Sequence, residues 1–306
     1  MLSIQSSPSL DYFSVPATVP EMFTRLPNDF RVNRRETEWA SINARGRIID
    51  SFLEAPVMHA DGRLYVSDIP YGRIFQIDAA GHWELALQYA GEPNGMKFIS
   101  PSEAYICDFL HGLVRWDVET NEVSPLIARK NSERFKGLND LTISSEGDIY
   151  FTDQGQTGLH DSTGRVYRYT RGGRLELVLD GVPSPNGLVL SADESVLFLA
   201  VTRDNSVWRV PLSKDGTAYK VGRFMTFNGP GGPDGLAMTA KGNLVIATPG
   251  VGAVWVVNEF GEVLERHDCR PFGNLPTNIA FDRDDTGRFY ITESLTGAIL
   301  VAQTQY

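Results

Sequence analysis

Apolar and polar positions along this chain form short runs that recur with a nearly constant spacing. Each repeat holds a short apolar strand, a turn rich in Asp, Ser and Gly, and a second, largely apolar strand whose pattern predicts burial on both faces. The predicted second strands are Leu64–Asp68, Ala104–Asp108, Ile149–Asp153, Leu197–Val201, Leu244–Thr248 and Phe289–Glu293. This pattern is typical of an all-β fold built from stacked sheets.

A side chain with an oxygen atom opens the first strand of every repeat. The copies are Glu54-Ala55-Pro56, Asn94-Gly95-Met96, Asn139-Asp140-Leu141, Asn186-Gly187-Leu188, Asp234-Gly235-Leu236 and Asn278-Ile279-Ala280. Their first residues are 40, 45, 47, 48 and 44 positions apart, which is the period of one four-stranded sheet in a β-propeller. The sequence therefore predicts a six-bladed β-propeller.

The last repeat has no fourth strand of its own before Tyr306. We predict that Ala44–Ser51 supplies it, so that an N-terminal strand completes the last blade, closes the ring and removes the exposed sheet edge. Residues 1–37 are then an N-terminal extension packed on the outside, in which Glu21–Arg25 forms at most a short helix. Residues 38–306 are the propeller domain.

The direction of the strands places the loops after the second strands on the same face as the oxygen donors. The longest of these loops is Gln154–Thr163, which makes it the best candidate for selecting a substrate. We expect Asn94, Asn139, Tyr71 and Phe109 to contact the substrate, and the two aromatic residues hint at a substrate less polar than a sugar acid. His160 is either a substrate or proton-transfer residue or an ordinary surface residue of the loop.

Acidic residues recur where the second strands end, namely Asp68, Asp108, Asp153 and Glu293. This regularity favours hydrogen bonding at the strand ends, although Asp153 is also a candidate for the pocket wall.

Two carboxylates and up to four amide oxygens that point into one axial tunnel are costly to bury without a cation, so we expect the six repeat oxygens to converge on one metal ion. Hard oxygen donors favour Ca²⁺, followed by Mg²⁺ or Mn²⁺, with Zn²⁺ the least favoured. We therefore predict one divalent cation held by Glu54, Asn139, Asn186 and Asp234. The alternative is that these polar residues only cap strands and hold water in the tunnel mouth.

The charge and composition of the chain narrow the classes of partner. A formal net charge of −10, with no dense Lys/Arg cluster, opposes binding to nucleic acid. Neither a leader peptide nor a membrane-spanning segment is recognisable, so we expect a cytoplasmic protein with no membrane partner. Cys107 and Cys269 are expected to be buried free thiols. The sequence does not predict an oligomeric state.

The motifs Glu54-Ala55-Pro56, Asn139-Asp140, Pro185-Asn186-Gly187 and Pro233-Asp234-Gly235 together resemble those of one known family. This is the gluconolactonase, regucalcin and luciferin-regenerating-enzyme family of six-bladed propellers. The resemblance implies a divalent metal at Glu54, Asn186 and Asp234, with Asn139 as a metal or substrate ligand. It also implies that Asp234 is the catalytic base that activates water to attack a lactone carbonyl.

One position departs from the sugar-lactone members of that family. They have an Arg two residues before the Asn that matches Asn139, where this chain has Gly137. The predicted function is thus a metal-dependent lactone hydrolase whose lactone is not identified. The alternatives are an organophosphate or phosphoester hydrolase on the same metal propeller and a non-catalytic binding propeller.

Overall fold

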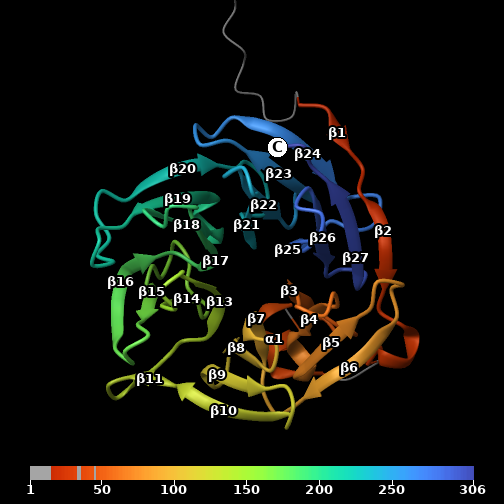
Figure 1. The fold of residues 1–306 in the computed structure, drawn as a ribbon, viewed down its shortest axis with the longest axis horizontal. Helices are drawn as coiled ribbons and strands as arrows, with labels where there is room; N and C mark the ends of the chain where they lie inside the picture. Colours follow the sequence, from red (N-terminus) through yellow and green to blue (C-terminus); the bar gives the residue numbers. More distant parts are fainter. Residues whose placement is uncertain (1–14, 33–35, 45) are drawn as a thin grey trace, which may run out of the picture.

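The computed structural model describes residues 15–32, 36–44 and 46–306. Within these residues, strands form six sheets of four or five strands that stand around a central axis as the blades of a ring (Figure 1). This arrangement confirms the predicted all-β, six-bladed propeller. None of the helices in the described part is long and apolar enough to cross a membrane.

In the first four blades the strands follow one another from the axis outward and pair antiparallel. Blade one consists of β3 (Leu53–Met58), β4 (Leu64–Asp68), β5 (Arg73–Ile77) and β6 (Trp83–Gln88). Blade two consists of β7 (Pro93–Ser100), β8 (Glu103–Asp108), β9 (Gly112–Asp117) and β10 (Glu122–Ile127). Blade three consists of β13 (Leu138–Ile143), β14 (Ile149–Asp153), β15 (Gly164–Tyr169) and β16 (Leu175–Val182). Blade four consists of β17 (Pro185–Leu190), β18 (Val196–Val201), β19 (Ser206–Pro211) and β20 (Gly222–Thr226).

The last two blades each receive a strand from the N-terminal part of the chain. Blade five is β21 (Leu236–Met238), β22 (Leu244–Thr248), β23 (Ala253–Val257) and β24 (Val263–Asp268), with β1 (Ala17–Thr18) parallel to β24. Blade six is β25 (Pro276–Phe281), β26 (Arg288–Glu293), β27 (Ala298–Gln303) and β2 (Glu21–Arg25). A small hairpin of β11 (Arg129–Lys130) and β12 (Glu133–Arg134) lies between blades two and three in the chain.

An N-terminal strand closes the ring, as predicted, but the strand is β2 and not Ala44–Ser51. Glu21 pairs with Val301 and Arg25 with Ala298, so β2 is the outer antiparallel strand of blade six. The side chains explain why this segment is a strand and not a short helix. Met22 packs against the hydrophobic cluster between blades five and six, whereas Phe23 packs against the cluster between blades six and one. Neighbouring side chains that point to opposite faces of the sheet have the two-residue period of a β-strand.

The segment predicted to be that strand lies near the ring axis instead. Helix α1 (Glu38–Asn43) is capped by Thr37, whose hydroxyl accepts a hydrogen bond from Ala40 N–H at 3.1 Å. Residues 46–52 then lead without regular structure to β3, and Arg45 lies outside the described residues. We call residues 36–44 and 46–52 the strap. The predicted division between extension and propeller at residue 37 stays a prediction, and much of that extension, residues 1–14 and 33–35, also lies outside the described residues.

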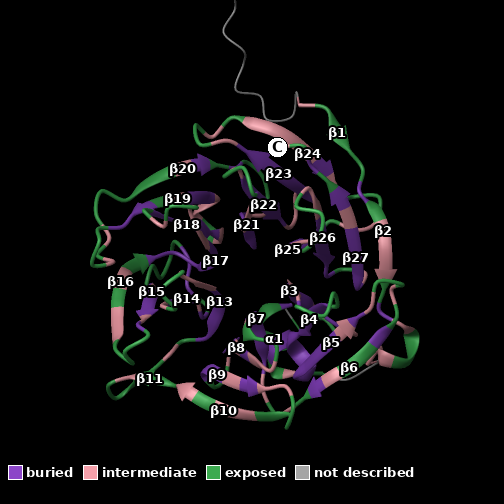
Figure 2. Cartoon of the chain, in the orientation of Figure 1, coloured by how far each residue is buried: buried purple, intermediate pink, exposed green. Residues whose placement is uncertain are grey.

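Hydrophobic clusters between neighbouring blades form the core. The inner and middle strands are mostly buried, and exposed residues concentrate in turns and outer strands (Figure 2). Tyr65 of blade one and Trp116 of blade two, for example, belong to one cluster with ring centroids 6.2 Å apart. Cys107 and Cys269 are buried free thiols, as predicted. Because each cluster joins two blades, closing the ring buries apolar surface on both faces of every sheet.

Candidate metal and active site

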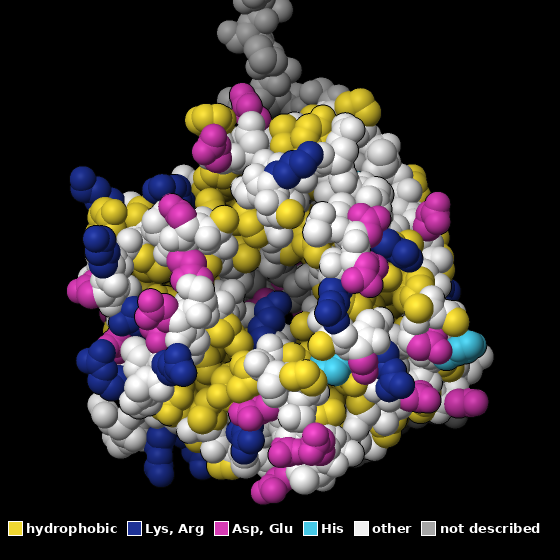
Figure 3. Space-filling model, in the orientation of Figure 1, with side chains coloured by type: hydrophobic (Ala, Val, Ile, Leu, Met, Phe, Trp, Pro, Cys, Tyr) yellow, Lys and Arg dark blue, Asp and Glu magenta, His cyan; other side chains and the backbone are white. Residues whose placement is uncertain are grey.

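A cavity of about 910 Å³ lies where the inner strands meet, and the strap forms part of its wall. Seen along the ring axis, the centre of the molecule is hollowed, with acidic and basic side chains visible inside (Figure 3). The five donors Glu54, Asn94, Asn139, Asn186 and Asp234 all line this cavity. The structure therefore brings together residues that are 40 to 180 positions apart in the sequence.

A β-bulge at the start of the inner strand positions most of these donors. The strand register shifts between Glu54 and Val57, between Pro93 and Met96, between Leu138 and Leu141 and between Pro185 and Leu188. A bulge bends the strand and re-aims one side chain, so in each of these blades the donor leaves the ladder and faces the axis. At the first bulge, Ala55 has φ 44°.

Tight contact between inner strands requires glycine after the donors Asn186 and Asp234. A side chain at Gly187 would approach the Asp234 carbonyl oxygen to 2.4 Å, and one at Gly235 would approach Asn278 to 2.3 Å. The repeated donor-glycine pair therefore has a steric cause beyond turn formation.

Two acidic donors, Glu54 and Asp234, are buried in the part of the cavity lining that we call the floor, and they interact electrostatically. Burial raises the pKa of Glu54 to about 7, with a further increase from the Asp140 carboxylate and opposition from the Ala55 N–H and the Asn278 amide. Burial, followed by repulsion from Glu54 and Asp140, raises the pKa of Asp234 well above its ordinary range. A site in which carboxylates raise one another's pKa binds a proton or a cation favourably.

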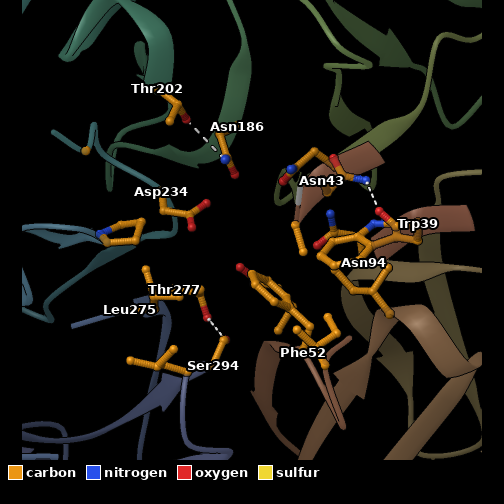
Figure 4. Close-up of a pocket in the computed structure, with 18 of the residues that line it drawn as sticks. Trp39, Asn43, Phe52, Asn94, Asn186, Thr202, Asp234, Leu275, Thr277 and Ser294 are labelled. Carbon is orange, nitrogen blue, oxygen red and sulfur yellow. Dashed lines mark hydrogen bonds between the residues drawn. The ribbon is translucent and has the colours of Figure 1, made fainter. Parts of the chain in front are cut away.

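The amide donors are oriented by hydrogen bonds to neighbouring side chains of the cavity lining. Asn186 Nδ2 donates to Thr202 Oγ1 at 3.1 Å, and that hydroxyl donates to the Pro233 carbonyl at 2.8 Å (Figure 4). Asn139 Nδ2 donates to Gln154 Oε1 at 2.8 Å, and Gln154 Nε2 donates to Ser184 Oγ at 2.9 Å. Because each amide NH₂ is used in this way, the Oδ1 atoms of Asn139 and Asn186 remain as acceptors.

The sixth repeat residue, Asn278, behaves differently from the other amides. Its Oδ1 accepts a hydrogen bond from Ile279 N–H at 2.8 Å, and its Nδ2 donates to Glu54 Oε2 at 3.0 Å. The same Nδ2 lies 3.4 Å from Asp140 Oδ2. The expectation that all six repeat oxygens converge on one ion is therefore wrong for Asn278, which supports Glu54 through its nitrogen.

Asp140, Thr202 and Gln154 are parts of this arrangement that sequence reasoning missed. Asp140 occupies the position that is Ala or Gly in four of the other repeats, and that exception was the available signal. Thr202 and Gln154 follow second strands. Gln154 begins the 154–163 loop that the sequence singles out, but nothing in the sequence marks either residue as the partner of an amide donor.

The predicted substrate contacts divide into those at the cavity and those away from it. Asn94, Asn139 and Phe109 line the cavity. Tyr71 is buried in the short 3₁₀ helix Ile69–Tyr71 outside the lining, and its hydroxyl donates to the Ile49 carbonyl of the strap. His160 is an exposed residue of the 154–163 loop, also outside the lining.

The strap supplies a wall that the sequence did not predict. Trp39, Ile48 and Phe52 line the cavity from this segment, and Figure 4 shows Trp39 and Phe52 on one side, with Asn186 and Asp234 across from them. Gln156 of the 154–163 loop donates to Asn43 Oδ1 of α1 at 2.8 Å. The strap and the long loop thus meet beside the cavity.

The oxygen donors at the floor fit a hard divalent cation. Among the described residues, no group of three or more His, Cys, Asp and Glu side chains is placed to hold a metal ion. The donor set here combines two carboxylates, Glu54 and Asp234, with the oriented amide oxygens of Asn139 and Asn186. Such mixed carboxylate and amide oxygens are ligands that Ca²⁺ accepts in proteins.

Comparisons with known proteins agree with this fold. Residues 52–294 match the family model described as SMP-30/Gluconolactonase/LRE-like region. A gluconolactonase of Zymomonas mobilis is 30% identical over 56% of this chain and 52% of its own length, so the chain spans about half of that relative. A lactonase drp35 of Staphylococcus epidermidis is 26% identical over 73% of this chain and 70% of its own length.

A solved structure has the same fold as this chain. A calcium-binding protein, regucalcin, from Agrobacterium tumefaciens superposes with a TM-score of 0.72 at 22% identity, covering 82% of this chain and 89% of that one. At this identity the likeness concerns the fold. The family model, in contrast, matches most of the sequence, from the last residue of the strap to the loop after β26. The chain therefore belongs to the SMP-30/gluconolactonase/LRE-like family.

Proposed function

We propose that this protein is a lactone hydrolase that depends on one divalent cation. The observation that carries the proposal is the pair of buried carboxylates, Glu54 and Asp234, beside amide oxygens held in place by their own hydrogen bonds. Membership of a family whose relatives include a gluconolactonase and a lactonase supports the reaction class. Ca²⁺ is the favoured cation, ahead of Mg²⁺, Mn²⁺ and Zn²⁺, and the Agrobacterium neighbour is named a calcium-binding protein.

In this proposal Glu54, Asn186 and Asp234 hold the cation, and Asn139 binds either the cation or the substrate. A bound divalent cation supplies polarisation of the lactone carbonyl oxygen. Asn94 lies on the same floor and is available to hydrogen-bond the substrate.

The chain's own chemistry centres on Asp234. Its carboxylate accepts a proton from the water that attacks the carbonyl carbon. The bond between the carbonyl carbon and the ring oxygen then breaks, and the proton passes to that leaving oxygen. The products are a hydroxyl and a carboxylic acid on one open chain, and the acid releases its proton to solvent to become a carboxylate.

An assay of lactone opening with metal in excess tests this mechanism. Asp234→Asn keeps the shape and one oxygen but removes the proton acceptor, so kcat should fall by about 100-fold or more. Asp180→Asn, an exposed change on outer strand β16, is the matched control and should leave kcat unchanged.

Three results would count against the proposal. Full turnover by Asp234→Asn would exclude it as the base. Hydrolysis of phosphoesters in place of lactones would favour the phosphoester alternative, and a protein without either activity would favour a binding propeller.

A further inference from the structure

The cavity wall between blades two and three is aromatic. Phe109, which follows β8, lines the cavity, and its ring lies directly over Gly137. A Cβ at position 137 would lie 2.4 Å from Phe109 Cε2 and 2.7 Å from Cζ. Gly137 also has φ 147°, a backbone conformation that favours glycine. A side chain from residue 137 is thus excluded, and Phe109 occupies that part of the wall.

Both sides of this contact are held in place by hydrogen bonds. Phe109 N–H donates to the Glu92 carbonyl at 2.9 Å. Asp108 Oδ1 accepts hydrogen bonds from the N–H groups of Leu110 and His111, at 2.8 Å each. Gly137 N–H donates to Asp153 Oδ1 at 3.1 Å, and the Gly137 carbonyl accepts from Gln154 N–H at 3.0 Å. The position of the Phe109 ring is therefore built into the fold.

Apolar side chains continue this wall toward the mouth of the cavity. The strap contributes Trp39 and Phe52, whose ring centroids are 4.8 Å apart, and Ile48. Leu295, in the loop after β26, lies on the lining as well. Ile48 and Leu295 are 53% and 51% exposed, so apolar surface extends from the interior to the solvent edge.

Charged side chains of the lining lie beside this apolar surface, and Arg203 acts electrostatically on Asp234 at the floor. Arg47 and Arg203 are exposed. Asp50 is paired with Arg31 at 2.8 Å. The buried charge belongs to the floor, where Glu54 and Asp234 lie. The cavity thus has a polar floor and an apolar sector of wall, made by Phe109, Trp39, Phe52, Ile48 and Leu295, beside polar lining residues such as Asn43, Gln154 and Thr202.

We infer that the substrate is a lactone whose ring carries an apolar alkyl or aryl substituent, and that Phe109 is a specificity-determining residue for that substituent. This inference rests on the proposed lactone hydrolase function. The ring carbonyl lies at the polar floor, and the substituent lies against Phe109 and extends toward Ile48 and Leu295. A polyhydroxylated lactone would instead bury hydroxyl groups against aromatic carbon without hydrogen-bond partners, which is unfavourable.

A series of γ-lactones with saturated side chains of increasing length tests the inference. We expect kcat/KM to rise with each added methylene by up to about four-fold, the value for full burial of a CH₂ group. Glucono-1,5-lactone should be a poorer substrate than the alkyl lactones. Phe109→Ala should flatten the dependence on chain length, and Phe109→Leu should restore part of it.

A matched control separates this effect from a general loss of folding. Phe260→Ala changes a phenylalanine that is 77% exposed in the turn between β23 and β24, and it should leave the slope of kcat/KM against chain length unchanged. Preference for glucono-1,5-lactone, or an unchanged slope in Phe109→Ala, would overturn the inference even if lactones are hydrolysed.

Binding of non-hydrolysable lactams with the same side chains distinguishes the two proposals. If lactam affinity, measured by calorimetry, rises with chain length and falls in Phe109→Ala but no lactone is opened, the proposed reaction fails and the specificity of the pocket stands. If lactones are opened while lactam affinity is independent of chain length, the specificity fails and the reaction stands.

Discussion

At the scale of single residues, the geometry of the candidate site depends on the hydrogen bonds that orient each donor side chain. Asn186 is directed by Thr202, whose hydroxyl accepts from the amide and donates to the Pro233 carbonyl next to Asp234. One hydroxyl therefore links two proposed ligands. Groups that orient a metal ligand commonly change metal affinity or activity by about 10- to 100-fold when removed.

Thr202→Val removes this hydroxyl and keeps the shape of the side chain. We expect Ca²⁺ affinity measured by calorimetry to fall by roughly 10-fold or more, because Asn186 loses its orienting partner. Activity at saturating Ca²⁺ should recover much of the loss. Thr142→Val on β13, outside the cavity lining, is the control. Equal Ca²⁺ affinity in Thr202→Val and wild type would show that Asn186 does not need Thr202.

The donors themselves could be predicted from sequence because they recur at a fixed place in a regular repeat. Asn278 shows the limit of that argument, since it shares the position but its oxygen is used by Ile279 N–H. Which atom of an amide faces a cavity depends on neighbours from other blades, here Glu54 and Asp140. A single repeat does not contain that information.

At the scale of strands, a carboxylate at the end of the second strand fastens the start of the inner strand in four blades. Asp68, Asp108, Asp153 and Glu293 accept hydrogen bonds from the N–H groups of Phe52, Glu92, Gly137 and Leu275, each the residue just before an inner strand. The predicted strand-end role is confirmed for all four. These bonds also fix where each donor enters the cavity.

One of these carboxylates should make stability depend on pH. Burial raises the pKa of Asp153 from 3.8 to about 6, although the N–H groups of Gly137 and Lys136 oppose the shift. Its Oδ2 is buried and has no hydrogen-bond partner among the described residues. The folded state therefore retains a proton that the unfolded chain has released, and the stabilisation from this group is lost as pH rises from about 4 to about 6.

Asp153→Asn removes this titration. We expect the free energy of unfolding of wild type minus that of the variant, measured in urea at each pH, to fall by up to roughly 3 kcal/mol between pH 4 and 6. Above pH 6 the difference should be constant. A difference that does not change over this range would show that Asp153 is ionised throughout.

Sequence patterns predicted the strands of the repeats but not which N-terminal segment closes the ring. Ala44–Ser51 contains Ile48 and Ile49, which favour a strand, whereas Met22 and Phe23 lie in a short segment with no repeat to mark it. The choice depends on which segment reaches the free edge of β27 with apolar side chains for both adjoining clusters. That is a tertiary condition, and it overrides local propensity.

At the scale of the whole molecule, the proposed cation ligands come from four different blades. Glu54 belongs to blade one, Asn139 to blade three, Asn186 to blade four and Asp234 to the start of blade five. A cation among them would join elements that are far apart in sequence at the one point where all inner strands meet. Without it, repulsion between Glu54 and Asp234 opposes closure of the ring.

Removing divalent cations should therefore lower the melting temperature of the whole domain. Binding to the folded state alone, at a free cation concentration 100 times Kd, stabilises by about 2.7 kcal/mol, or roughly 5 °C in a chain of this size. We expect calorimetric scans after chelation to show that decrease, and titration with Ca²⁺ to reverse it.

Glu54→Gln should respond less to Ca²⁺ and melt higher than chelated wild type, because one of the repelling charges is gone. Glu259→Gln, in the exposed turn after β23, should behave as wild type in both states. If the purified protein contains no metal and its melting curve is unchanged by chelator and Ca²⁺, the carboxylate pair is stabilised by a shared proton instead, and the metal site is excluded.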